Sequence, residues 1–284
     1  MRPSRRRRAR RARPLDVALA ATLHDPRGAL ADEIRRALPA LTTVYRGIAI
    51  ATSPPTSARD VGLLQSAGVH AGPVATNLRG PLYRLSLRAA LATGAARVHY
   101  LDFDRALHWL RRAPRELRAV LRLASRHPVL VVGRTAKAHR SHHVPLWSTE
   151  VLANRLLADR LGLVRPLDVL VPSFVAERAA AARLLAQSRA RDNALYGEWA
   201  ARVLTLGDDV AYVECRGLDW ETPDRHRRAV RRIGLACWRR RQETTAEWDL
   251  RLRIAAEIVR GFATVWQRLG RSPPTVRRLP PRVG

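Results

Sequence analysis

Residues 99–105, His99-Tyr100-Leu101-Asp102-Phe103-Asp104-Arg105, form an apolar segment that runs into an Asp-x-Asp motif. The apolar pattern predicts a β-strand over residues 97–103. Side chains two residues apart on a strand point to the same face, so Asp102 and Asp104 are expected to converge at its carboxyl end. Two converging carboxylates suit a hard divalent cation such as Mg²⁺ or Mn²⁺, which would bridge a diphosphate. We therefore expect a metal site at Asp102 and Asp104.

Apolar strand-like runs alternate with helical patterns on both sides of this segment. Such alternation predicts an α/β fold: a mostly parallel central sheet with helices on both faces, Rossmann-like in form. Ligands of such sheets bind outside the carboxyl ends of the strands, so the loops after residues 23, 52, 103 and 133 are candidate sites. The expected strands are 16–23, 44–52, 69–76, 97–103 and 128–133, and the expected helices are 28–41, 57–67, 80–93 and 105–126, the last interrupted at Pro114.

The pattern changes after residue 134. We expect a His- and Arg-rich loop over 135–147, a helix over 148–161, a strand-like run over 166–174, helices within 175–206 and a strand over 208–216. A helical segment follows over 224–269, broken near Gly234 or around 242–245. The predicted organisation is a disordered Arg-rich arm (1–14), one domain (15–220), C-terminal helices packed on it (221–270) and a Pro/Arg-rich tail (271–284).

The composition is that of an ordinary globular protein. Of 284 residues, 46% are hydrophobic and 27% charged, which excludes a largely disordered or fibrous chain. The apolar run 15–23 contains Asp16 and has no small-residue cleavage pattern after it, so we do not expect a secretory signal. Two cysteines make neither a disulfide framework nor a four-ligand zinc site. A reduced, cytoplasmic location is expected.

The net charge of +28 favours an anionic partner. Only Lys137 among the 52 basic residues is lysine, and heavy use of Arg and Ala is what a GC-rich genome encodes whatever the function. Residues 225–241 hold eight arginines and no acid, which indicates either a solvated helix face or a peripheral contact with an anionic membrane at its inner face. Nucleic acid is less favoured because no helix-turn-helix, zinc-finger or aromatic RNA-binding signature is present.

Four motifs in residues 15–220 carry a resemblance to a known family. They are His24-Asp25-Pro26-Arg27 after the first strand, Ser53-Pro54-Pro55-Thr56 after the second, Tyr83 to Arg88 followed by Gly94, and Asp102-Phe103-Asp104. With these motifs the sequence resembles the nucleotide-diphospho-sugar transferases of the GT-A fold, particularly the family-2-like glycosyltransferases. The resemblance implies transfer of a sugar from a nucleoside-diphosphate donor to an acceptor hydroxyl, with inversion and with a divalent metal. The acceptor stays open.

The resemblance also implies roles for particular residues. Asp102 would lie near the nucleotide and its ribose, and Asp104 would be the direct metal ligand. Asp192 or Glu198 is favoured as the general base over the pair Asp208-Asp209. The remaining candidates are Asp25, Ser53, Arg84 and Arg88 for the donor, and Glu150, Trp220 and Glu221 for the acceptor side.

Other interpretations of the same features stay open. His139, His142 and His143 suit a solvated basic loop better than a metal cluster, and a third use is a loop that closes over the diphosphate. Thr222 to Asp224 are typical of a helix start. Val171 to Phe174 replace the family's Gly-rich acceptor-side turn, which points to a changed acceptor pocket or to lost activity. The alternatives are a nucleotidyltransferase of the same fold, disfavoured because the first loop lacks a glycine pattern, and a non-catalytic basic binding protein.

Overall fold

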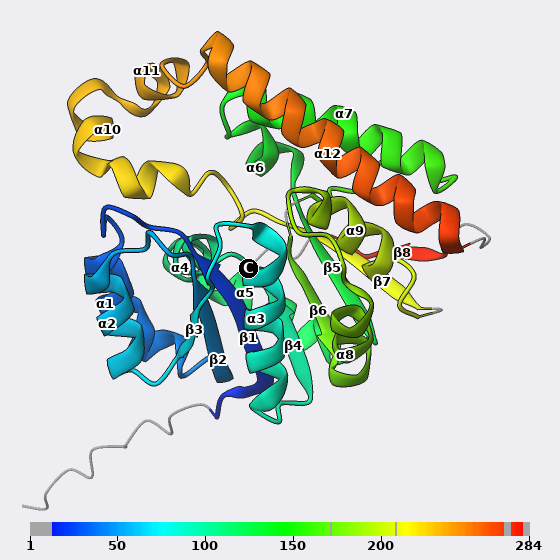
Figure 1. Ribbon diagram of the computed structural model, residues 1–284, viewed down its shortest axis with the longest axis horizontal. Helices are drawn as coiled ribbons and strands as arrows, with labels where there is room; N and C mark the ends of the chain where they lie inside the picture. Colours follow the sequence, from blue (N-terminus) through cyan, green and yellow to red (C-terminus); the bar gives the residue numbers. More distant parts are fainter. Residues whose placement is uncertain (1–12, 171, 208, 270–273, 281–284) are drawn as a thin grey trace, which may run out of the picture.

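The computed structural model describes residues 13–170, 172–207, 209–269 and 274–280 (Figure 1). Its centre is an eight-stranded sheet in the order β3-β2-β1-β4-β6-β5-β7-β8. β6 runs antiparallel to both of its neighbours, and the other strand pairs are parallel. The strands are β1 (Leu15–Leu23), β2 (Tyr45–Thr52), β3 (His70–Pro73), β4 (Arg97–Tyr100), β5 (Val129–Arg134), β6 (Phe174–Glu177), β7 (Val210–Cys215) and β8 (Val276–Arg278).

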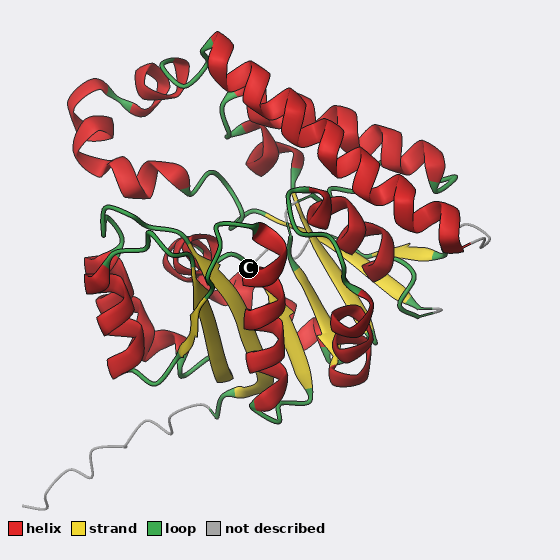
Figure 2. Cartoon of the chain, viewed as in Figure 1, coloured by secondary structure: helices red, strands yellow, loops and turns green. Residues whose placement is uncertain are grey.

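Helices cover both faces of the sheet (Figure 2). Alternate residues of β1 belong to two separate hydrophobic clusters, Ala18 and Ala20 on one face and Val17 and Leu19 on the other. The expected fold class, a mostly parallel central sheet with helices on both faces, is therefore confirmed. One face carries α1 (Ala31–Leu41), α2 (Ala58–Ser66), α4 (Phe103–Arg112) and α5 (Pro114–Ala124), and the other carries α3 (Arg79–Ala92), α7 (Val144–Arg160), α8 (Arg178–Gln187), α9 (Ala194–Val203) and α12 (Thr245–Leu269).

Helix α12 approaches α9 closely because glycine stands at both sides of the crossing. A Cβ atom on Gly197 would lie 1.8 Å from the carbonyl oxygen of Ile258, and one on Gly261 would lie 2.1 Å from that of Ala194. Glycine permits such backbone contact because it has no side chain. These contacts fix the helical C-terminal extension against the domain.

The segment between β7 and α12 consists of short helices. They are the 3₁₀ helix η1 (Thr222–His226), α10 (Arg227–Ile233) and α11 (Leu235–Arg240), which extend outward at the upper left of Figure 1. The expected long helix over 224–269 is broken at both of the proposed places. Gly234, with φ of 78°, separates α10 from α11, and residues 241–244 separate α11 from α12.

The strand that carries the Asp-x-Asp motif ends earlier than expected. β4 stops at Tyr100, Asp102 is the N-cap residue of α4, and Asp104 lies in the first turn of that helix. The prediction of a strand over 97–103 was wrong at its end, and so was the argument that strand alternation aligns the two carboxylates. The physical reason lies in Asp104, because an acidic side chain is favoured in the first helical turn; Asp102 is the N-cap residue by position, and its side chain makes no capping hydrogen bond.

Several other boundaries differ from the expected ones. The described part of 166–173 is irregular, and the strand forms later, as β6. The expected loop 135–147 contains α6 (Ala136–Arg140), which Thr135 caps, and α7 begins at Val144. The expected tail contributes the edge strand β8. Outside the described residues lie most of the N-terminal arm (residues 1–12), Asp208, and residues 270–273 and 281–284. Among the helices that the structure describes, none combines the length and apolar character that a bilayer span requires.

Candidate functional site

The strand order leaves a topological switch point between the ends of β1 and β4, and the region between the loops that follow these two strands is here called the crevice. The chain passes from β1 to β2 and β3 on one side and returns to pair β4 with the other edge of β1. The loops after β1 and β4 therefore diverge, which is the topological switch point where open α/β sheets bind ligands. Asp25 lies in the first of these loops, and Asp102 and Asp104 lie in the second.

Asp102 is held in place by hydroxyl groups. Its Oδ1 accepts hydrogen bonds from Thr22 Oγ1 at 3.0 Å and from Tyr83 OH at 2.9 Å. The Tyr83 hydroxyl also lies 2.9 Å from that of Tyr196, so α3 and α9 both support this carboxylate. Burial raises the pKa of Asp102 above its ordinary value, while the nearby guanidinium groups of Arg105 and Arg79 act to lower it.

Asp104 is paired with an arginine from the far end of the sequence. Arg225, in η1, donates from Nη2 to Asp104 Oδ2 at 2.7 Å. Its Nη1 donates to the backbone oxygen of His24 and lies 3.8 Å from Asp25 Oδ1. The guanidinium group thus bridges the crevice from the β1 side to the β4 side. The side chain of Asp25 is fixed by its own loop, since its Oδ2 accepts the backbone N–H of Leu30 at 2.7 Å.

The arginines beside the aspartates are not those that the resemblance implied. Arg79, Arg105 and Arg225 act electrostatically on Asp102 or Asp104, whereas Arg84 donates to the backbone oxygen of Ala190 at 2.7 Å. Arg88 is exposed on α3. Arg105 follows the Asp-x-Asp motif directly and Arg79 begins α3, so the sequence positions of these two arginines weakly indicated that they lie near the aspartates. The sequence position of Arg225 gave no such indication.

Ser53, which the resemblance implied on the donor side, lies in the loop after β2 as expected. Ser53 is buried, and its Oγ lies 2.7 Å from His24 Nδ1 and 3.0 Å from Thr56 Oγ1. His24 belongs to the loop after β1. Ser53 therefore links the ends of β1 and β2 at the same edge of the sheet as Asp25.

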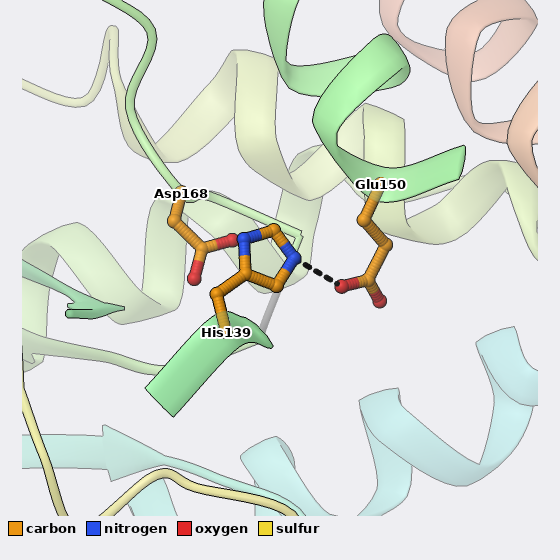
Figure 3. Close-up of side chains that lie close together, drawn as sticks. All are labelled: His139, Glu150 and Asp168. Carbon is orange, nitrogen blue, oxygen red and sulfur yellow. Dashed lines mark hydrogen bonds and ion pairs between the residues drawn. The ribbon is translucent and has the colours of Figure 1, made fainter. Parts of the chain in front are cut away.

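A second polar cluster lies beyond β5 and includes Glu150 (Figure 3). Ligand atoms of His139, Glu150 and Asp168 lie within 4.8 Å of one another. The fully buried guanidinium of Arg134 donates from Nε to Asp168 Oδ2 at 2.7 Å and from Nη2 to Glu150. Burial acts to raise the pKa of Glu150, but Arg134 and His139 hold it well below the ordinary range. A cation in this cluster would face a buried arginine, so the residues present fit an ion-pair network and not a metal site.

The three histidines after β5 do not act together. His139 joins Glu150 at 3.2 Å, His142 directs Nδ1 to the backbone oxygens of Ala138 and His139, and His143 lies 3.5 Å from Glu247. All three are buried, so the interpretation as a solvated loop was wrong. Their ring nitrogens point to different partners, which also separates them as metal ligands.

Glu221 lies between the two clusters, among polar atoms that lack partners. Its carboxylate is 3.7 Å from Arg105 Nε and 3.8 Å from His142 Nε2, longer than hydrogen bonds. Within the described part of the chain, four buried atoms here have no hydrogen-bond partner: Arg105 Nη1, Arg134 Nη1, His142 Nε2 and Glu221 Oε2. Two of these atoms are donors and one is an acceptor, a combination that suits hydroxyl groups or ordered water.

The remaining candidates have structural partners of their own. The two carboxylate oxygens of Glu198 accept from the backbone N–H groups of Arg189 and Ala190, at 2.8 and 2.9 Å, and from two side chains. Asp192 Oδ1 accepts the backbone N–H of Ala194, the first residue of α9, at 2.9 Å, and its side chain is 47% exposed. Trp220 is buried against Trp238, with ring centroids 5.1 Å apart. The general base stays a prediction.

Comparisons with known proteins find similarity only among solved structures. No protein-family model matches the chain, and no curated protein matches it in sequence. These include structures of glucosyl-3-phosphoglycerate synthase from Mycobacterium tuberculosis. The complex with Mg²⁺ and uridine diphosphate has a TM-score of 0.41 at 11% identity, covering 94% of this chain and 70% of that one. The complex with phosphoglyceric acid has a TM-score of 0.40 at 13% identity, covering 77% and 66%. Values this low assign no function.

Proposed function

We propose that this protein is a glycosyltransferase that moves a sugar from a nucleoside-diphosphate donor to an acceptor hydroxyl. The observation that carries the proposal is the mixture of charges at the switch point of the sheet, where Asp25, Asp102 and Asp104 lie with Arg225 across them. Guanidinium groups match the oxygen geometry of a diphosphate, and carboxylates accept hydrogen bonds from ribose hydroxyls or bind a metal.

The positions of these residues suggest which part of the donor each of them would contact. The loops that hold Asp25 and Ser53 would contact the nucleoside, and Asp102 would contact the ribose. Arg79 and Arg105 take the diphosphate role in place of Arg84, whose guanidinium is committed to Ala190. The sugar would extend toward the unpartnered atoms of Arg105, Arg134 and Glu221, which offer both donors and acceptors to hydroxyls.

A divalent metal is part of this proposal, and the residues present fit one provided that Arg225 moves away from Asp104. Asp102 and Asp104 supply the carboxylate oxygens that Mg²⁺ and Mn²⁺ prefer. Arg225 holds the cationic position at Asp104 Oδ2, so a metal there requires this arginine to change partner. A bound metal would stabilise the charge that develops on the leaving diphosphate. For the general base, Asp192 has the more available carboxylate, because the oxygens of Glu198 are already used.

A thermal-shift screen against nucleoside mono- and diphosphates, with and without Mn²⁺, tests the proposal. A ligand at about 100 times its Kd adds roughly 2.7 kcal/mol to the folded state. We expect a Mn²⁺-dependent shift with one base that the D102N/D104N variant loses. A matched control is D159N/D249N, which removes the same charge from exposed helix surfaces. No shift with any nucleotide, or a shift that D102N/D104N keeps, would contradict the proposal, and release of pyrophosphate from a nucleoside triphosphate would favour a nucleotidyltransferase.

The arginine-rich segment 225–241 supports a second part of the proposal, peripheral binding to an anionic membrane by a cytoplasmic protein. Arg228, Arg231, Arg232 and Arg240 are exposed, and Leu235 at the start of α11 is 51% exposed. Cationic side chains around an exposed apolar residue suit a lipid headgroup layer. Sedimentation with vesicles containing phosphatidylglycerol tests it: the protein should bind these and not phosphatidylcholine, and R231Q/R232Q/R240Q should weaken binding. Tighter salt-sensitive binding to RNA than to vesicles would overturn it.

A further inference from the structure

A separate pocket of about 380 Å³ opens beside the carboxyl ends of β5 and β7. These strands are parallel neighbours, with Arg134 opposite Cys215, so the residues that follow them lie side by side. The backbone N–H of Thr135 donates to the oxygen of Cys215 at 3.0 Å and keeps the two loops together. Thr135, Lys137 and Arg216 line the pocket from these loops, and Arg112 lines it from the end of α4.

The charge in this pocket is positive. Lys137 and Arg216 are exposed, and within the described residues neither has an acidic side chain at ion-pair distance. Arg112 Nη2 lies 3.8 Å from Asp219 Oδ2, the acidic group of the lining. Asp219 is already compensated, because its Oδ1 lies 2.8 Å from His108 Nε2. Burial opposes a charge on His108, but hydrogen bonds to Asp219 and Asp224 raise the pKa of His108 to about 9, so the imidazole is cationic at neutral pH.

The pocket is distinct from the crevice at Asp102 and Asp104. Arg112 closes α4 whereas Asp104 lies in its first turn, and eight residues of helix span about 12 Å. The two sites therefore lie at opposite ends of one helix.

We propose that this pocket binds a phosphorylated small molecule, whose phosphate oxygens contact Arg112, Lys137 and Arg216. Three cations converging on one hollow suit a multiply charged oxyanion better than a single carboxylate, since guanidinium groups bind phosphate oxygens in pairs and lysine adds a compact charge. The volume lies in the range of small-molecule sites. The inference does not rest on the proposed transferase activity.

The sequence provides a direct test, because Lys137 is the only lysine of the chain. Amine acylation followed by peptide mass spectrometry therefore reports on one side chain. Pyrophosphate and orthophosphate are the probes, each compared with sodium chloride of equal ionic strength. We expect pyrophosphate at about ten times its Kd to slow acylation of Lys137 about tenfold by mass action.

Matched variants separate a built site from diffuse charge. R112Q/R216Q should abolish the protection of Lys137, and R36Q/R253Q, which removes the same charge from exposed positions on α1 and α12, should keep it. Unfolding temperatures of both variants show whether the fold is intact. Protection by chloride alone, protection that survives R112Q/R216Q, or equal loss in R36Q/R253Q would each overturn the proposal and indicate adventitious ions. D102N/D104N should keep the protection, so failure of the donor site is seen separately.

Discussion

Arg225 Nη2 lies 2.7 Å from Asp104 Oδ2, a contact between residues 121 positions apart. It is one of several ion pairs that hold residues 219–227, here called the closing segment, against α4. Asp219 and Asp224 both contact His108, and Glu221 faces Arg105. A ligand that binds Asp104 Oδ2 must therefore replace Arg225 of this segment. The further pairs are Asp224 with Arg111 and Arg227 with Glu33.

Replacing Arg225 with glutamine should strengthen metal binding. The variant removes the positive group that faces Asp104 Oδ2, and one such charge near a protein surface is worth on the order of 1–4 kcal/mol. Mn²⁺ titration followed by electron paramagnetic resonance should show an affinity at least about tenfold higher, equivalent to about 1.4 kcal/mol. R228Q, at an exposed position of α10, is the control. An unchanged affinity in R225Q would mean that Arg225 does not hold the metal position.

Substitution of the two candidate general bases, Glu198 and Asp192, should change the free energy of unfolding by different amounts. Glu198→Gln should lower the free energy of unfolding by about 1–3 kcal/mol, because the carboxylate accepts from two backbone N–H groups and from Ser188 and Arg202. Asp192→Asn keeps an accepting oxygen at a half-exposed position and should stay within about 1 kcal/mol. Urea denaturation measures both. Equal losses would contradict the structural role given to Glu198.

The crossing of α9 and α12 should not accept a methyl group. Gly261→Ala would place a Cβ atom 2.1 Å from the carbonyl oxygen of Ala194, so we expect a loss of at least about 2 kcal/mol. Gly62→Ala is the matched control within α2, because a Cβ there meets no atom within 4 Å and alanine favours the helix by about 1 kcal/mol. Thermal unfolding should move in opposite directions for the two variants, and a neutral G261A would show that the helices pack differently.

His108 should make stability depend on pH in the alkaline range. Its folded pKa of about 9 exceeds the ordinary value of 6.5, so its contribution is fully present below about pH 6.5 and is lost as the pH rises through 9. Over that range the wild type should lose roughly 2–3 kcal/mol that His108→Gln does not lose. Urea unfolding at pH 6 and pH 9 measures the difference. Parallel pH profiles for the two proteins would rule out a charged His108.

Much of the sheet could be predicted from the sequence because its strands are mainly apolar runs between turn residues. β1, β2, β5 and β7 have this form, and Pro114 and Gly234 mark helix boundaries in the way their backbones require. The strand expected over 166–174 was placed too early, because the structure forms β6 over Phe174–Glu177. It has four residues and inserts antiparallel between β4 and β5, an arrangement that only the assembled sheet defines.

The candidate site was only partly predictable. Asp102 and Asp104 stand out because a paired acidic motif follows an apolar strand, yet Asp104 also favours a first helical turn, and the helix prevailed. Arg225 could not be assigned, since its contact with Asp104 is purely tertiary and its neighbourhood reads as a run of surface arginines. Glu221 was a candidate because of the unusual composition of its segment, residues 220–225, whereas its position between Arg105 and His142 depends on the same long-range packing.

The closing segment is attached by charges, and the adjoining α10 buries none of its side chains. The attaching side chains are largely shielded from water, since Arg225 and Asp104 are 19% and 21% exposed and His108 and Asp224 are 6% and 15% exposed. Charges paired at 2.7 Å in such partly buried places are screened by salt far less than exposed charges. Ordinary electrolyte should therefore leave this attachment almost unchanged, whereas loss of charge at any one of these groups would remove a contact outright.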